Sequence, residues 1–212
     1  MFSVIFDMDG TLLDTQKICI PAWHYAGELQ GFKNVGDCIY HVCGMNEKGW
    51  TAFLESRYPA LDTLSFKRDM RDYIIKNGKV VFRKGAKELL DFLKQNNIKM
   101  AIASGSSRQT IDHHLGEVGA AHYFDAIVGG KDIENGKPAP DIFLLAAKLI
   151  GAQPKDCFVF EDSENGIKAG INAGMKCIGF PDIVPFKEET KKLLFAELDD
   201  LSKAIEIFKQ HL

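Results

Sequence analysis

Long apolar runs, paired cysteines and an excess of basic charge are all missing from this sequence of 212 residues. No apolar stretch approaches the roughly 18–20 residues of a membrane span, so we expect no membrane partner. The formal net charge of −3 offers no basic surface to nucleic acid. The five cysteines lack Cys-x-x-Cys spacing, which favours reduced thiols over disulfides or a zinc site. The first residues show no basic n-region and no cleavage site, so we expect a cytoplasmic protein.

An alternation of strands and helices runs through most of the chain. Short apolar runs typical of buried strands occupy residues 2–6, 99–103, 126–128, 157–160 and 176–179. Helical periodicity lies between or after them, at about 85–95, 108–118, 141–150, 163–173 and 201–208. Strands that alternate with helices predict right-handed βαβ units and an α/β fold with a Rossmann-like, doubly wound parallel sheet.

One stretch, residues 15–78, breaks this alternation because its periodicity is helical throughout. Apolar residues recur at helical spacing near 18–29, 35–42, 50–58 and 66–75, and no strand signal interrupts them. We expect Asp14-Thr15 to cap the first helix and Pro21 to bend or restart it. The sequence therefore predicts an all-helical insertion of three or four helices at 15–78, within a core made of residues 1–14 and 79–212.

Two carboxylates, Asp7 and Asp9, directly follow the first predicted strand. Acids at the end of a buried strand are costly unless a cation neutralises them, and Mg²⁺ prefers carboxylates, carbonyls and water. Gly10 lets the backbone turn tightly, and Thr11 offers a hydroxyl and an N–H to whatever the metal holds. An ordinary strand-to-turn boundary is the competing explanation.

Further polar groups lie at the ends of other predicted strands or in a connecting loop. They are Ser104-Gly105-Ser106, Lys137 and Glu161-Asp162. Each has an ordinary explanation alone: a helix cap for the serine, a solvated side chain for the lysine, and helix-start charges for the acids. Ligands of doubly wound sheets bind beyond the carboxyl ends of the strands, so we expect these groups to meet Asp7 and Asp9 there.

Phosphoryl transfer needs each type of group in this set. Asp7 would be the nucleophile that forms an aspartyl-phosphate. Asp9 would protonate the leaving alkoxide and then activate water. Lys137 would place a fixed positive charge beside the phosphoryl oxygens and Asp7.

Binding roles follow for the remaining residues. Thr11, Ser104, Gly105 and Ser106, together with Lys137, would hold the phosphoryl oxygens, as helix-start anion sites do. Asp162 and Glu161 would complete a metal shell with Asp7 and the Asp9 carbonyl. The six histidines show no metal spacing, and we interpret all of them as surface or local packing residues: His24, His41, His113, His114, His122 and His211.

The four motifs together resemble the haloacid dehalogenase superfamily, in its β-phosphoglucomutase/phosphoglycolate phosphatase-like branch. The carriers are Asp7-Met-Asp9-Gly-Thr-Leu-Leu-Asp14, Ala-Ser104-Gly-Ser, Gly-Lys137-Pro-Ala-Pro-Asp-Ile-Phe and Val-Phe-Glu161-Asp162-Ser-x-x-Gly166-Ile-x-Ala169. The resemblance covers essentially the whole chain. It implies a Rossmann-like core, Mg²⁺ dependence, an aspartyl-phosphate intermediate with the roles given above, and a helical cap that closes over the substrate.

Departures from family patterns bear on the reaction. The namesake dehalogenases lack the second aspartate, so Asp9 favours phosphoryl transfer over carbon–halogen cleavage. Phosphonatases carry a Schiff-base lysine in the cap, and no cap lysine here lies in a recognisable motif. The resembled β-phosphoglucomutases usually have a histidine where this chain has Cys19 and an arginine in the cap loop, where residues 41–50 have none. Lys48 could supply positive charge in place of the missing cap-loop arginine.

We therefore expect a Mg²⁺-dependent phosphatase that acts on small phosphorylated metabolites of the sugar or polyol phosphate type, as a monomer. The enzyme alternative is β-phosphoglucomutase, and the alternative of a different class is a non-catalytic protein that binds phosphometabolites. We expect the substrate to be selected by a cap loop with Gly44, Met45, Asn46 and Lys48.

Overall fold

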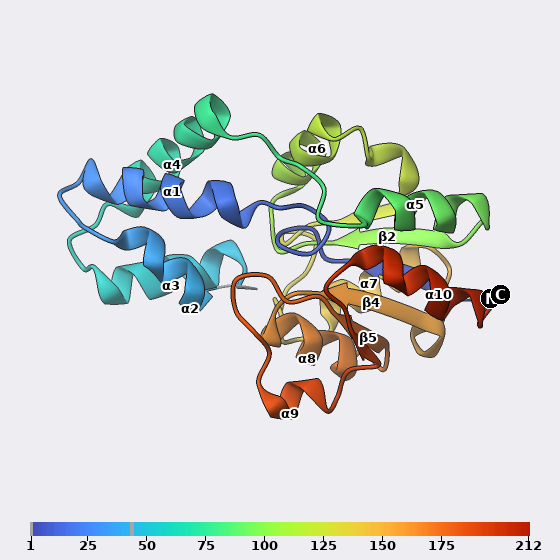
Figure 1. The fold of residues 1–212 in the computed structure, drawn as a ribbon. Helices are drawn as coiled ribbons and strands as arrows, with labels where there is room; N and C mark the ends of the chain where they lie inside the picture. Colours follow the sequence, from blue (N-terminus) through green and yellow to red (C-terminus); the bar gives the residue numbers. More distant parts are fainter. Residues whose placement is uncertain (1, 43–44) are drawn as a thin grey trace.

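The computed structural model describes residues 2–42 and 45–212, and within them six strands form one parallel sheet (Figure 1). The strands are β1 (Ser3–Phe6), β2 (Lys99–Ala103), β3 (Ala126–Val128), β4 (Cys157–Glu161), β5 (Lys176–Gly179) and β6 (Ala196–Glu197). Their order across the sheet is β3-β2-β1-β4-β5-β6, and every neighbouring pair is parallel. This order confirms the predicted doubly wound sheet. The two-residue β6 was not predicted because so short a strand has no readable period.

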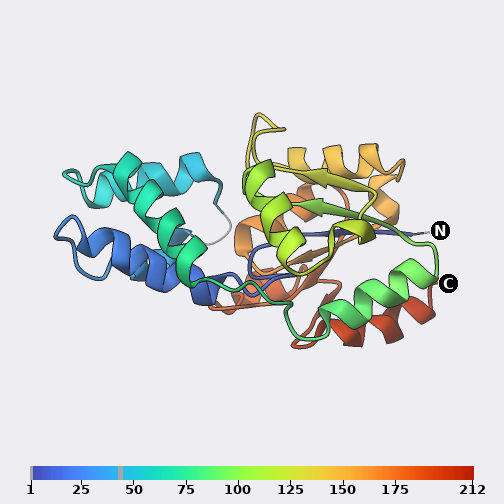
Figure 2. The same cartoon turned by 90° about the horizontal axis from the view of Figure 1, so that it is seen from above.

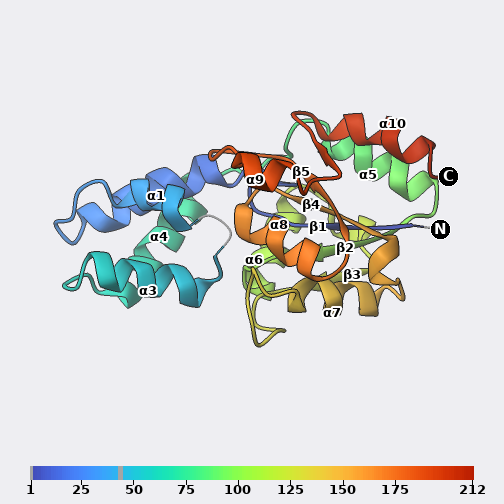
Figure 3. The same cartoon turned by 90° about the horizontal axis from the view of Figure 1, so that it is seen from below.

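Helices cover both faces of the sheet (Figures 2 and 3). Their bounds are α5 (Ala86–Gln95), α6 (Arg108–Glu117), α7 (Asp141–Leu149), α8 (Glu164–Asn172), α9 (Glu188–Lys191) and α10 (Ala204–Lys209). Short 3₁₀ turns lie at η2 (Ala121–Tyr123), η3 (Pro154–Asp156) and η4 (Leu201–Lys203). Apolar residues of α5, α6 and α10 join one core cluster, and those of α7 and α8 join the other.

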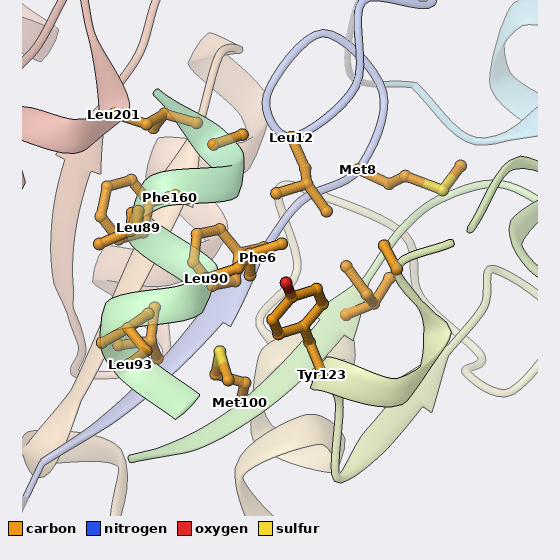
Figure 4. Close-up of a cluster of buried hydrophobic side chains, with 14 of the residues drawn as sticks. Phe6, Met8, Leu12, Leu89, Leu90, Leu93, Met100, Tyr123, Phe160 and Leu201 are labelled. Carbon is orange, nitrogen blue, oxygen red and sulfur yellow. The ribbon is translucent and has the colours of Figure 1, made fainter. Parts of the chain in front are cut away.

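The central strand β1 explains why both faces are covered. Val4 and Phe6 belong to the cluster under α5, whereas Ile5 belongs to the cluster under α7 and α8. All three are fully buried, as alternating side chains of a strand between two helical layers should be. Phe6 stacks on Phe160 of β4 with ring centroids 4.9 Å apart, beneath the leucines of α5 (Figure 4). This packing holds the strand end that precedes Asp7.

The insertion is helical, as predicted, and lies to one side of the sheet (Figure 1). It contains α1 (Gln16–Glu28), the 3₁₀ turn η1 (Val35–Cys38), α2 (Ile39–Val42), α3 (Glu47–Arg57) and α4 (Thr63–Asn77). These elements share a core cluster of their own, in which Trp23 meets the Phe66 ring edge-on at 5.4 Å. The boundaries at 14/15 and 78/79 stay a prediction.

Pro21 does not restart α1, and the predicted cap at the start of the helix is confirmed in position only. The helix runs from Gln16 to Glu28 through Pro21 without a break, because it is held along its length by contacts with α4 and η1. Thr15 occupies the N-cap position, but its side chain makes no capping hydrogen bond. Its hydroxyl oxygen is buried without a hydrogen-bond partner among the described residues.

The two segments that connect the helical part to the sheet lie side by side. Leu13 forms an antiparallel bridge with Phe82. The N–H of Asp14 donates to the Val81 carbonyl at 2.9 Å, and the N–H of Arg83 donates to the Leu12 carbonyl at the same distance. The chain therefore enters and leaves the helical part at one paired stem.

Two expectations drawn from missing features can be compared with the described part of the chain. None of its helices combines the length and the apolar character needed to cross a bilayer. Its four cysteines are all free thiols: Cys19, Cys38, Cys157 and Cys177.

Candidate active site

The carboxyl ends of three adjacent strands bring the predicted site residues together. Asp7 follows β1, Ser104 follows β2, and Glu161 is the last residue of β4, directly before Asp162. Because β1 lies between β2 and β4, these positions share one edge of the sheet. Lys137 joins them from the loop between β3 and α7.

Lys137 is the positive centre of the site. Its Nζ donates to Asp7 Oδ1 and to Glu161 Oε1, each at 2.5 Å, and to the Ala103 carbonyl at 3.2 Å. The lysine side chain is only 5% exposed. Burial alone would lower the pKa of Lys137, but the Asp7 and Glu161 carboxylates together raise it above its usual value. The ammonium is therefore a permanent charge at neutral pH.

Three buried carboxylates form an oxygen-rich cluster beside this ammonium. Ligand oxygens of Asp7, Glu161 and Asp162 all lie within 4.8 Å of one another. Burial raises the pKa of Asp7 well above its ordinary value, and burial and the Glu161 charge raise the pKa of Asp162 to about 8. Lys137 alone therefore does not offset the cost of ionising all three carboxylates. An all-oxygen donor set with this deficit of positive charge fits Mg²⁺.

Asp9 belongs to a different part of the site. Its Oδ2 accepts hydrogen bonds from the Ser104 hydroxyl at 3.2 Å and the Ser106 hydroxyl at 2.8 Å. The N–H of Ser106 in turn donates to the Ser104 hydroxyl at 3.1 Å. Ser104 is almost fully buried, whereas the Asp9 side chain is 31% exposed. Asp9 is therefore open to a ligand.

Supporting contacts explain why the fourth motif contains serine and glycine. The Ser163 hydroxyl accepts from the Gly166 N–H at the start of α8 and donates to Glu161 Oε2 at 3.0 Å. A Cβ on Gly166 would overlap the Glu161 carboxylate. The hydroxyl of Thr11 donates to Asp162 Oδ1 at 3.2 Å, so its side chain orients a predicted metal ligand. Its proposed role toward phosphate stays a prediction.

A cavity of about 460 Å³ lies between the sheet edge and the helical part. Its sheet side includes Asp7, Asp9, Ser104, Gly105, Ser106, Lys137 and Asp162. Its helical side is mostly apolar, with Trp23, Ile39, Val42, Met45, Trp50, Met70 and Ile74. The cavity therefore joins the polar strand ends to a wall that can contact the body of a small organic molecule.

The predicted cap loop contributes unevenly to this cavity. Met45 lines it. Asn46 caps α3, because its side chain accepts from the Gly49 N–H at 2.9 Å. Lys48 is exposed and is not among the lining residues. Gly44 lies outside the described residues.

Two cationic side chains and a histidine are among the lining residues that the sequence did not single out. Lys67 and Arg71 reach the cavity from α4, and their i, i+4 spacing beside Met70 was a readable signal that both share one helix face. His114, interpreted from the sequence as a surface or local packing residue, reaches the cavity from α6 and is only 8% exposed. No sequence signal marked it.

Comparisons with known proteins agree with this geometry. The family described as haloacid dehalogenase-like hydrolase matches residues 3–174. A phosphorylated carbohydrates phosphatase from Thermotoga maritima is 32% identical over 185 residues, which cover 84% of each chain. Fructose-1-phosphate phosphatase from Escherichia coli is 33% identical over 181 residues, covering 82% of this chain and 94% of that relative.

A solved structure shows the same fold over the whole length. β-Phosphoglucomutase from Clostridium difficile superposes with a TM-score of 0.80 at 24% identity, covering 100% of this chain and 96% of the other. The family match spans most of the chain, and the two phosphatases cover more than two thirds of it at over 30% identity. This chain therefore belongs to the haloacid dehalogenase-like hydrolases.

Proposed function

We propose that this protein is a Mg²⁺-dependent phosphatase of small phosphorylated metabolites, of the sugar or polyol phosphate type. The observation that carries the proposal is the contact of Lys137 with both Asp7 and Glu161 at the edge where Asp9 faces the cavity. The names of the relatives from Thermotoga maritima and Escherichia coli support a phosphorylated carbohydrate as substrate.

The first half-reaction transfers the phosphoryl group to the protein. A carboxylate oxygen of Asp7 attacks phosphorus, the bond between phosphorus and the substrate oxygen breaks, and Asp9 gives its proton to that leaving oxygen. Lys137 stabilises negative charge on the phosphoryl oxygens and holds the Asp7 carboxylate in place. A Mg²⁺ ion held by Asp7, Asp162 and Glu161 would supply further positive charge at the phosphoryl oxygens.

The second half-reaction restores Asp7. The Asp9 carboxylate now takes a proton from water, and the water oxygen attacks phosphorus of the aspartyl-phosphate. The acyl phosphate bond breaks, inorganic phosphate leaves, and Asp7 returns as a carboxylate. The Ser104 and Ser106 hydroxyls, with the backbone before α6, would hold the phosphoryl oxygens through both steps.

β-Phosphoglucomutase stays as a second candidate because of one observation. Lys67 and Arg71 line the cavity on the side opposite the strand ends, where a second phosphate of a bisphosphate intermediate would need positive charge. Lys67 already pairs with Glu47 at 3.0 Å, which reduces the charge that it offers. A mutase would convert β-glucose 1-phosphate to glucose 6-phosphate when primed with a bisphosphate, whereas a phosphatase would release inorganic phosphate.

The deciding experiment is a phosphate-release assay on p-nitrophenyl phosphate and a panel of sugar and polyol phosphates. We expect release in MgCl₂, loss in EDTA and recovery when MgCl₂ is restored. Asp7→Asn should abolish both release and acid-stable labelling of the protein by substrate phosphate. Asp199→Asn, on a side chain that is 78% exposed, is the matched control and should remain active.

Two outcomes would contradict the proposal. Near-normal turnover in Asp7→Asn would show that the nucleophile is wrongly assigned. No turnover on any substrate, combined with thermal stabilisation by a phosphorylated ligand, would support the non-catalytic binding protein instead. The monomeric state and cytoplasmic location remain predictions.

A further inference from the structure

His114 is a buried polar residue that the proposed chemistry leaves without a role. Its side chain is only 10% exposed, and it lines the cavity from α6. Its Nδ1 atom is buried and has no hydrogen-bond partner among the described residues. Buried polar atoms without partners are rare in folded proteins, so this nitrogen calls for an explanation.

The atom that faces this nitrogen belongs to the proposed proton donor. His114 Nδ1 lies 3.9 Å from Asp9 Oδ1, which is too long for a hydrogen bond. The other oxygen of the same carboxylate, Oδ2, accepts from the Ser104 and Ser106 hydroxyls. Each carboxylate oxygen of Asp9 therefore faces its own set of polar groups.

A bound substrate would disturb this arrangement. The hydroxyls of Ser104 and Ser106 are the groups proposed to hold phosphoryl oxygens, so a bound phosphate competes with Asp9 Oδ2 for them. Asp9 then needs another donor to fix its carboxylate while Oδ2 turns to the leaving oxygen. An Nδ1–H of His114 is within about 1 Å of hydrogen-bonding distance to Oδ1.

The element that carries His114 is suited to hold it still. The Ser107 hydroxyl caps α6 by accepting from the Thr110 N–H at 3.2 Å. Ile111 and Leu115, on either side of His114 in the helix, are fully buried in the core cluster under α5. A donor on a capped and packed helix can fix a catalytic side chain more accurately than a loop residue can.

We propose that His114 is a positioning residue that holds the Asp9 carboxylate for proton transfer to the leaving oxygen. This inference rests on the proposed role of Asp9. It requires only a proton on His114 Nδ1, which donates to Asp9 Oδ1 while Oδ2 carries the transferred proton. His114 itself exchanges no proton with the substrate.

Two substrates with different leaving groups separate positioning from a purely structural role. An alkoxide leaving group needs a proton from Asp9, whereas p-nitrophenolate is stable enough to leave without one. The measured quantity is the rate of the first half-reaction, read as the pre-steady-state appearance of acid-stable phosphate on the protein. One substrate is p-nitrophenyl phosphate, and the other is the most active sugar or polyol phosphate of the panel.

The variants change the donor and keep the fold. His114→Phe keeps a ring without a donor, and we expect it to slow transfer from the alkyl phosphate by about tenfold or more, since proton transfer contributes ~10²–10⁴-fold. Transfer from p-nitrophenyl phosphate should change less than about threefold. His114→Asn, whose amide nitrogen can lie near the Nδ1 position, should restore most of the alkyl rate. His122→Phe, on an exposed histidine, should leave both rates unchanged.

The outcomes distinguish this inference from the proposed function. Asp9→Asn is measured first and should slow the alkyl substrate selectively; if it does not, the assigned role of Asp9 is wrong. Suppose that Asp9→Asn slows only transfer from the alkyl phosphate. The positioning role of His114 is then overturned if His114→Phe slows transfer from both substrates equally, or slows transfer from neither. His114→Leu is the second variant without a donor, should the phenylalanine not fold. In the Asp9→Asn background, His114→Phe should add no further selective loss, and an additive loss contradicts the inference.

Discussion

Replacing Lys137 by methionine tests the electrostatics of the site directly. Methionine keeps most of the apolar stem and removes the ammonium that lies 2.5 Å from both Asp7 and Glu161. The Asp7 and Glu161 side chains are 9% and 1% exposed, so water cannot solvate their carboxylates once the ammonium is removed. We expect Lys137→Met to fold but to be clearly less stable than the parent protein.

The size of the expected stability loss follows from the burial of the Lys137 ion pairs. Removing one partner of a buried ion pair typically costs about 3–5 kcal/mol, because the other charge stays buried without compensation. The carboxylates can bind protons instead of remaining charged, which places the expected loss near the lower value, about 3 kcal/mol. For a chain of this size, that loss corresponds to a fall in Tm of about 6–12 °C.

Thermal unfolding in EDTA and in saturating MgCl₂ provides the measurement. The deficit should be smaller in MgCl₂, because the cation supplies positive charge to the same carboxylates. Lys99→Met is the matched control: its Nζ lies 2.9 Å from Asp125, but the side chain is 56% exposed, and such surface pairs contribute about 0–1 kcal/mol. A second change, Glu161→Gln, should recover part of the stability lost in Lys137→Met.

One result would refute this reasoning. If Lys137→Met in EDTA unfolds within about 2 °C of Lys99→Met, the buried carboxylates do not depend on the ammonium for compensation. The clustering of Asp7, Glu161 and Lys137 would then have no electrostatic consequence. The catalytic role of the lysine would need independent support.

Three further predictions concern the neighbours of this centre. Burial raises the pKa of Asp162 from its ordinary value to about 8. Between pH 6 and pH 8 the folded state then binds a proton that the unfolded state lacks, so the free energy of unfolding in EDTA should fall as the pH rises. In Asp162→Asn, the free energy of unfolding measured in urea should depend less on pH than in the parent protein. An equal dependence on pH would contradict the raised pKa of Asp162. Thr11→Val removes the hydrogen bond to Asp162. The MgCl₂ concentration for half-maximal activity should then rise about 10–100-fold. No change in that concentration would contradict the role of Thr11. Gly166→Ala places a Cβ against the Glu161 carboxylate and should lower the free energy of unfolding in urea by about 1–3 kcal/mol. Gly116→Ala is the control, because a Cβ there meets nothing within 4 Å, and it should be stabilising. Equal changes in the two variants would contradict the predicted clash.

Much of the fold was predictable because its strands are buried on both faces. β1 and β4 are short continuous apolar runs, since Ile5 and Phe6 point into different clusters and neither meets water. The carboxyl ends of such strands must share one edge, so the meeting of Asp7 with Glu161 followed from the order of elements alone. Lys137 lies in a loop, where no hydrophobic periodicity marks the position of a side chain. It was therefore predictable only through its sequence motif.

The position of His114 and the contacts of Thr11 and Pro21 depend on tertiary geometry. His114 faces Asp9 because of how α6 is rotated on the sheet, which no local pattern encodes. The hydroxyl of Thr11 turns to Asp162 for a similar reason, since its partner comes from another strand. Pro21 lies within α1 because contacts with α4 outweigh the local cost of proline in a helix.

The paired stem at Leu13–Phe82 has a consequence for how such a hydrolase can diversify. The sheet meets the whole helical part as one long loop whose ends are already together. Loop-closure entropy rises only slowly with loop length, by roughly 0.6 kcal/mol for each doubling. A larger, smaller or differently folded lid could therefore be grafted at this stem at little cost to the sheet. If the proposed function holds, selectivity for the substrate could change in the helical part while the residues at the strand ends stay as they are.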